Sequence, residues 1–170
     1  MFEIESKDVD EITITTKKTS VTFNVASGMV DAGLKVGKIQ GPGEFEIGDV
    51  AIRAIGVGIQ GDGESAKEGG SKVVAFDPKE AKTIYDVLVN GVHVGIIGGC
   101  EEGLDDLGMA AILCTSSVRA VREIEPKLVV AMGNVDGMVT ELKLSARTEK
   151  KLKVKNGESL PMALEVVVLN

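Results

Sequence analysis

The sequence predicts an α/β fold in which β-sheets dominate and helices come late in the chain. Short segments of alternating apolar residues fill the first third, an Asn-Gly turn separates two apolar runs near the middle, and a helical pattern begins only after residue 115. The 170 residues suit one domain, spanning residues 1–170. Apolar residues make up 44% and charged residues 26%, which is typical of a globular protein able to bury a core.

The N-terminal third is expected to form short antiparallel strands. Glu11–Thr16 and Thr19–Val25 both alternate with period two around a Lys-Lys turn, which predicts a hairpin with one buried side. Gly28–Gly37 is interpreted as a loose linker and Gly41–Gly43 as a turn. Phe45–Ile55 then predicts two strands around a Gly-Asp turn.

The middle of the chain combines a glycine-rich stretch with the strongest hairpin signal. Six glycines between Gly56 and Lys72 predict a flexible surface loop. Val73–Phe76 is expected to form a strand and Lys79–Lys82 a connection. A two-residue Asn-Gly turn then joins two apolar runs, which predicts a hairpin over Thr83–Val89 and Val92–Ile97.

The C-terminal half is expected to place buried strands beside short helices. Met109–Leu113 predicts a buried strand, and the hydroxyls of Thr115–Ser117 offer N-cap oxygens for an amphipathic helix over Val118–Ile124. The continuous apolar run Leu128–Met132 is typical of a strand buried on both faces. The remaining segments predict one helix and two strands: Thr140–Lys151, then Lys151–Val154 and Leu164–Leu169.

Composition argues against several classes of function. The net charge of −7 makes nucleic acid an unsuitable main partner. No window approaches the ~18 to 20 uninterrupted apolar residues of a membrane span, and the first residues lack the pattern of a signal peptide. The two cysteines, Cys100 and Cys114, form no disulfide framework and fit a reducing cytoplasm. The chain has a single histidine, His93, whereas zinc hydrolases usually bind their metal with several imidazoles.

Several segments, taken in order, resemble the metallo-β-lactamase superfamily. Gly41-Pro42-Gly43-Glu44-Phe45-Glu46, followed by Val50–Ile55, is similar to a Gly-Pro-Gly-Glu-aromatic-Glu turn and the next strand in that superfamily. The other similar segments are the hairpin from Thr83 to Gly98, the junction Ile124–Val130, and the closing strands Lys151–Val154 and Glu165–Leu169. From Lys38 onward the chain resembles the small bacterial and archaeal zinc-dependent hydrolases related to ascorbate-phosphate lactonases. This resemblance implies an αββα sandwich of two mixed sheets, truncated in this chain.

The resemblance also implies where metal ligands would stand, and the chain has no donor side chain at those positions. The His-x-His-x-Asp-His loop would fall between Ala26 and Lys38, where the sequence has only a short linker without histidine. A further histidine would lie near Ile59, the bridging aspartate at Gly99 and the last histidine at Gly133. Glycine supplies no ligand, and without a metal the superfamily's zinc mechanism has no activated water. The resemblance therefore implies the fold without the cofactor.

Two thiols and the lone histidine are interpreted as structural. Cys100 follows two glycines at the expected cleft, and an ordinary semi-buried thiol is favoured over a nucleophile or metal ligand because no base lies beside it. Cys114 ends an apolar run and is expected in the core. His93 alternates with Val92 and Val94, so a solvated or hydrogen-bonded histidine on the opposite face is expected.

Two polar groups remain near the expected cleft. An acidic group could suggest a hard-cation site, but its spacing lacks the EF-hand pattern and a solvated loop is favoured: Glu101, Glu102, Asp105 and Asp106. Asn134 and Asp136 are candidates to line a residual polar pocket. The vestigial cleft is therefore predicted to comprise Ile59, Gly99, Cys100, Gly133, Asn134 and Asp136.

The functional expectation is a non-catalytic binding or scaffold protein in the cytoplasm, with no cofactor. Trimming the metal loop is expected to expose apolar sheet surface, which favours self-association or a protein partner. One alternative is a divergent hydrolase of phosphate esters or lactones with a rebuilt zinc site near Cys100, Asn134 and Asp136. Another is a sensor that holds a small ligand in the vestigial cleft.

Overall fold

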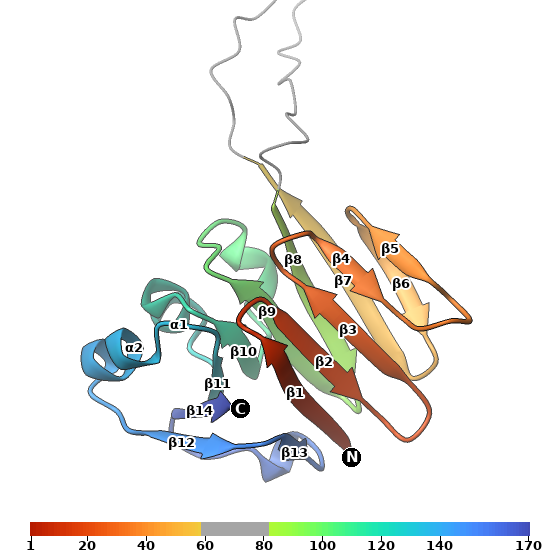
Figure 1. Cartoon of the computed structure of the whole chain (residues 1–170). Coiled ribbons are helices and arrows are strands. Elements are labelled where there is room, and N and C mark those ends of the chain that lie inside the picture. Colours follow the sequence, from red (N-terminus) through yellow and green to blue (C-terminus); the bar gives the residue numbers. More distant parts are fainter. Residues whose placement is uncertain (59–81) are drawn as a thin grey trace, which may run out of the picture.

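Figure 1 shows the computed structural model of the chain, which describes residues 1–58 and 82–170. Two sheets face each other, and the helices lie on the outer side of the second sheet. The predictions for Val73–Phe76, for Lys79–Lys82 up to residue 81 and for the glycine-rich loop from residue 59 lie outside the described residues. Gly56 and Val57, which were expected to open that loop, instead complete a strand.

The first sheet has six strands in the order β13-β1-β2-β3-β4-β5 and is antiparallel throughout. Its strands are β1 (Phe2–Asp8), β2 (Glu11–Thr15), β3 (Ser20–Asn24), β4 (Met29–Asp31), β5 (Lys38–Gln40) and β13 (Leu152–Val154). The predicted hairpin is confirmed as β2 and β3. The interval expected as a loose linker contains β4, because Val30 is buried between the sheets and pairs with Phe23 and Ile39.

The second sheet has eight strands in the order β12-β14-β11-β10-β9-β8-β7-β6. They are β6 (Gly43–Ile47), β7 (Val50–Val57), β8 (Lys82–Val89), β9 (Val92–Gly98), β10 (Ile112–Thr115), β11 (Leu128–Ala131), β12 (Ala146–Glu149) and β14 (Glu165–Leu169). Strands β6 to β9 are antiparallel neighbours, whereas β9, β10, β11, β14 and β12 are parallel neighbours. The Asn-Gly hairpin is confirmed as β8 and β9, with Asn90 and Gly91 at positive φ.

Two hydrophobic cores hold these layers together. The first lies between the sheets and includes Phe2, Ile14, Phe23, Val87 and Val130, all at most 1% exposed. The second lies between the outer face of the eight-stranded sheet and the helical segments. These segments are η1 (Leu104–Leu107), α1 (Val118–Ile124), α2 (Val135–Leu142) and η2 (Gly157–Ser159), of which η1, α1 and α2 contribute to the second core. The predicted sandwich of two facing sheets is confirmed. Two mixed sheets were expected, whereas only the eight-stranded sheet is mixed, because each described pairing in the six-stranded sheet is antiparallel.

The outer face of the six-stranded sheet is polar among the described residues. Thr13 and Thr22 hydrogen-bond across β2 and β3 at 2.9 Å, and Lys151 contacts Glu3 and Glu5 across the sheet edge. No described helix covers this face, yet alternation along each strand directs the apolar side chains inward. The apolar surface expected from trimming is therefore not found on this sheet.

Two element boundaries in the C-terminal half differ from the predictions. The strand expected over Met109–Leu113 begins at Ile112, because Met109 is 75% exposed and backbone pairing with β9 and β11 starts three residues later. The helix expected over Thr140–Lys151 ends at Leu142, where Lys143 adopts a left-handed conformation with φ of 55°. Ala146–Glu149 forms β12 instead, since it pairs with β14 at the sheet edge. Non-local pairing overrides helix propensity here.

Tyr85 is fully buried in the first core, on the inner side of β8. Its ring packs edge-to-face against Phe23 with centroids 5.3 Å apart. Its hydroxyl has no hydrogen-bond partner among the described residues. Burial raises the pKa of Tyr85 from 10.0 to about 12. Within the described part of the chain, the hydroxyl is thus desolvated on folding without a compensating hydrogen bond.

Replacing Tyr85 by phenylalanine should therefore stabilise the protein by about 1 kcal/mol, since it removes an unsatisfied buried polar group and keeps the ring. Because the raised pKa keeps the folded phenol protonated, titration of Tyr85 leaves the stability unchanged below pH 10.0 and lowers it as the pH rises toward about 12. The Tyr85→Phe variant lacks this loss. Urea unfolding at neutral and alkaline pH measures both effects, and a less stable variant at neutral pH would contradict this account.

Candidate functional site

The carboxyl ends of β9, β10 and β11 lie side by side because these strands are parallel neighbours. Ligand-binding side chains commonly gather at this edge of open α/β sheets. The amide of Ser116 donates to the carbonyl of Gly98 at 2.9 Å, and the amide of Met132 donates to the carbonyl of Thr115 at 2.9 Å. Backbone hydrogen bonds therefore fasten the three strand ends to one another.

Thr115 is the polar centre of this edge and is fully buried. Its hydroxyl donates to the carbonyl of Gly98 at 2.7 Å and accepts from the amide of Ser117 at 2.9 Å. Both hydrogen-bonding roles of the hydroxyl are thus used within the protein. Thr115 fixes where β10 ends relative to β9.

Ser117 joins the start of α1 to the segment that follows β9. Its hydroxyl accepts from the amide of Ala120 at 3.1 Å, which confirms the predicted N-cap. The same hydroxyl donates to Oε1 of Glu101 at 2.6 Å, and Oε2 of Glu101 lies 3.8 Å from Arg119. Glu101, expected in a solvated acidic loop, is therefore a partner of the helix cap, because the fold brings its carboxylate to the first turn of α1.

The two thiols are both buried. Cys100 is 6% exposed, and its Sγ lies 3.7 Å from the carbonyl oxygen of Glu102, which it contacts as a weak donor. Cys114 is fully buried in the first core as expected, and burial raises its pKa to about 12. A thiol that stays protonated is a poor nucleophile and a poor metal ligand, so the chemistry of Cys114 is suppressed.

The turn after β3 packs against the end of β9 and the start of β8. A Cβ added at Gly98 would lie 2.9 Å from Cγ2 of Val25, and one added at Gly28 would lie 3.1 Å from Oγ1 of Thr83. Both glycines have positive φ, which L side chains rarely adopt. Backbone and an aliphatic side chain thus occupy the space beside Gly98.

Those residues predicted for the vestigial cleft that the structure describes follow β9 or β11 at this edge. Gly99 follows β9, and a Cβ there would lie 3.2 Å from the Ser116 hydroxyl. Gly133 follows β11 with open space beside it, and the exposed Asn134 folds back onto Gly137. The other predicted positions are Cys100, buried as described above, Asp136, exposed in the first turn of α2, and Ile59, which lies outside the described residues. The cleft itself stays a prediction.

The donor set at this edge does not fit a zinc ion. Zinc in proteins is held by three or four thiolate, imidazole or carboxylate groups. Cys100 and Glu101 are the candidates next to β9, and both already bind groups of the protein. In residues 1–58 and 82–170, no group of three or more histidine, cysteine, aspartate or glutamate side chains is placed to hold a metal.

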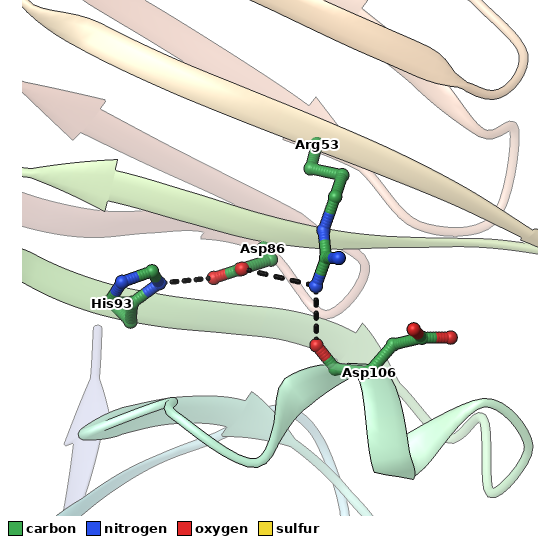
Figure 2. A network of polar contacts seen from close by, with 4 residues as sticks. All are labelled: Arg53, Asp86, His93 and Asp106. Atoms are coloured by element: carbon green, nitrogen blue, oxygen red, sulfur yellow. Dashed lines mark hydrogen bonds and ion pairs between the residues drawn. The ribbon is translucent and has the colours of Figure 1, made fainter.

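His93 belongs to a different network on the outer face of the second sheet (Figure 2). Nδ1 of His93 lies 2.9 Å from Oδ1 of Asp86, and Nη2 of Arg53 lies 3.4 Å from Oδ2 of the same carboxylate. The Arg53 guanidinium also donates to the carbonyl of Asp106 in η1. Val92 and Val94 face the opposite side and are buried, as the alternation predicts. This network ties η1 to the sheet and lies near the start of β9, whereas the cleft was predicted at its end.

Three shallow hollows mark the described surface. One of about 410 Å³ lies beside the edge strand β6 and includes Arg53 and Asp86. Another of about 600 Å³ lies near His93 and Lys127 at the amino ends of β9 and β11. A third of about 250 Å³ lies on the polar face of the six-stranded sheet and includes Lys7 and Asp31. The lining of these three hollows does not include the predicted cleft residues.

The facing sheets, with helices outside the mixed one, define the chain as a protein with the metallo-β-lactamase fold. Among solved structures, it is similar to a proposed zinc-dependent hydrolase of the metallo-β-lactamase superfamily from Thermotoga maritima. The TM-score is 0.64 and the identity 12%, and the alignment covers 100% of both chains. No family model and no curated protein matches the sequence. At this identity the likeness establishes the fold, which confirms the structural part of the predicted resemblance.

Sequence reasoning missed the roles of Thr115 and Glu101, although it selected both segments. Thr115 was considered only as an N-cap acceptor, and Glu101 only as a member of an acidic loop. The partner of Thr115 is Gly98 in β9, 17 residues away, and the partner of Glu101 is Ser117 at the start of α1, 16 residues away. A buried strand that ends in three hydroxyl residues was the available signal.

Among the described residues, no helix is long and apolar enough to cross a membrane.

Proposed function

We propose that this chain is a non-catalytic protein with the metallo-β-lactamase fold, which works without zinc by binding another protein. The observation that carries the proposal is the strand-end network of Thr115, Ser117 and Glu101. The resemblance implies a metal at this edge, and the polar groups there hydrogen-bond to one another instead. Zinc hydrolysis needs a metal to generate hydroxide near neutral pH, and these residues offer no set of open ligands.

The kind of partner follows from the surface. Self-association was expected through exposed apolar sheet, and the polar face of the six-stranded sheet does not favour it. A different protein is therefore the partner that we propose. A reducing cytoplasmic setting is part of the proposal, supported by two unpaired, buried cysteines, Cys100 and Cys114. The net charge of −7 supports a partner other than nucleic acid.

Thermal unfolding with a chelator tests the absence of a structural or catalytic metal. A ligand that binds only the folded state raises the melting temperature, and its removal lowers it. We expect the same melting temperature for the purified protein alone, with excess EDTA and with one equivalent of zinc. A decrease with EDTA that zinc reverses would overturn the proposal and favour the divergent hydrolase.

An activity assay provides the second readout. Aryl phosphate esters and an aliphatic lactone should be hydrolysed no faster with the protein and added zinc or manganese than with buffer and metal alone. Saturable turnover that is lost in Cys100→Ser or Glu101→Gln would identify a rebuilt site at the strand ends. Turnover unaffected by either substitution would point to a contaminant.

A further inference from the structure

The helical layer covers only part of the outer face of the eight-stranded sheet. In the second core, helical residues pack on the outer side of β9, β10, β11 and β14, and this core also includes Val57 of β7 and Ile84 of β8. Toward the β6 edge of the same outer face, four residues are exposed on β6, β7 and β8: Glu44, Glu46, Ala51 and Leu88. Figure 1 shows β6 and β7 at the far side from α1 and α2. This part of the face is open among the described residues.

A hollow of about 410 Å³ occupies this open part, and its lining combines three carboxylates and Arg53 with apolar side chains such as Ala51 and Leu88. The strand register aligns Glu46, Ala51 and Leu88 in one row across the sheet. Leu88 is 39% exposed, and it is among the few large apolar side chains with that much exposure. A row of carboxylate, methyl and isobutyl groups suits a partner that is both cationic and aliphatic.

The neighbouring row across the sheet carries more negative than positive charge. It consists of Glu44, Arg53 and Asp86. The Arg53 guanidinium is already bound to Asp86 and to the carbonyl of Asp106, as Figure 2 shows. Among the described residues, no cationic side chain forms a salt bridge with the carboxylates of Glu44 and Glu46 beside the hollow.

β6 also presents a free strand edge. It pairs with β7 on one side and is the last strand of the sheet as described, so its outward N–H and C=O groups can accept another strand. A second copy is a poor occupant. Every antiparallel pairing of two β6 strands that keeps the outer faces on one side places Glu44 or Glu46 opposite a glutamate of the other copy, and like charges directly opposite are destabilising.

We infer that the β6 edge binds an extended segment of a partner protein with lysine or arginine at alternating positions and aliphatic residues between them. The segment adds a strand beside β6, which supplies main-chain hydrogen bonds. Its basic side chains lie opposite Glu44 and Glu46, and their aliphatic stems, which share that face, cover Ala51 and Leu88. The aliphatic residues between them point to the opposite face, beside Phe45 and Ile47. This inference rests on the proposed function, because it names the surface and the partner chemistry of a binding protein.

The test uses an end-blocked, fluorescein-labelled hexapeptide of alternating lysine and valine as the probe. Fluorescence anisotropy should show saturable binding to the full chain that weakens as salt rises. The double variant Glu44→Lys/Glu46→Lys should bind about tenfold more weakly or worse, since two favourable cross-strand pairs become repulsive. The matched control Glu102→Lys/Glu141→Lys makes the same charge change at exposed positions away from β6 and should bind with only a small loss.

Hydrogen exchange separates the occupants of the edge. The probe should protect the outward amides of β6, and far-UV circular dichroism should show both double variants folded. Equal binding by the two double variants, or no saturable binding by the wild type, would overturn the inference. Protection of β6 that rises with protein concentration without peptide would also overturn it in favour of a second copy. Zinc dependence in the melting experiment would instead overturn the proposed function, whatever the peptide does.

Discussion

Replacing Gly98 by alanine is expected to destabilise the chain by about 2 kcal/mol, because two costs add at this position. Gly98 has φ of 56°, a left-handed conformation that strains a residue with a Cβ. The added Cβ would also lie 2.9 Å from Cγ2 of Val25, so the turn after β3 must shift. The carbonyl that accepts from Thr115 and Ser116 would move with it.

Urea unfolding followed by circular dichroism measures this effect, with Gly91→Ala as the matched control. Gly91 also has positive φ, at 74°, but a Cβ there would meet nothing within 4 Å. The control therefore contains the backbone strain without the contact and should cost less. Combining Gly98→Ala with Val25→Ala should recover the part due to the contact. If Gly98→Ala costs no more than Gly91→Ala, the turn after β3 does not pack against the end of β9.

Thr115→Val is expected to cost about 2 kcal/mol, although the two side chains have nearly the same shape. Thr115 is fully buried, and its hydroxyl donates to the Gly98 carbonyl and accepts from the Ser117 amide. Valine leaves that amide without this acceptor in a place that water does not reach, and an unsatisfied buried donor carries its full desolvation cost. Thr115→Ser keeps the hydroxyl and should lose much less.

Thr13→Val is the matched control for this substitution. Thr13 is also buried, at 3% exposed, but among the described residues its hydroxyl has one partner, the hydroxyl of the half-buried Thr22 on the polar sheet face. We expect a smaller loss in urea unfolding. Equal losses of unfolding free energy for the two valine variants would mean that the strand-end network stabilises the fold no more than the Thr13–Thr22 hydrogen bond does.

Much of the fold follows from local patterns. The alternation of Glu11–Thr16 and Thr19–Val25 around a tight turn gives β2 and β3, and the Asn-Gly turn gives β8 and β9. The Leu128–Met132 run gives a central parallel strand, since only a strand covered on both faces is apolar at every position. Each of these signals lies within one segment.

The parts that were predicted wrongly depend on contacts between distant segments. Ala146–Glu149 becomes β12 because β14 offers an open edge, which the helical composition of Thr140–Lys151 cannot reveal. Val30 becomes part of β4 because Phe23 and Ile39 lie on either side of it. Intrinsic propensities of a few tenths of a kcal/mol per residue are weaker than such pairing.

The candidate site shows the same division. That Gly99 and Gly133 stand at former ligand positions is implied by the resemblance and stays a prediction. The hydrogen bonds at the strand ends could not be predicted. The bonds from Ser117 to Glu101 and from Thr115 to Gly98 form only when β9 and β10 end at the same level, a feature of parallel register.

The metal content of the purified chain tests the central claim most directly. The protein would be prepared without chelators from cells grown with added zinc, passed through gel filtration, and analysed for zinc, manganese and iron against its concentration. Because the carboxylate and hydroxyls at the strand ends bind one another, we expect no metal to approach one ion per chain. One retained transition-metal ion per chain, lost in Cys100→Ser or Glu101→Gln, would contradict the account.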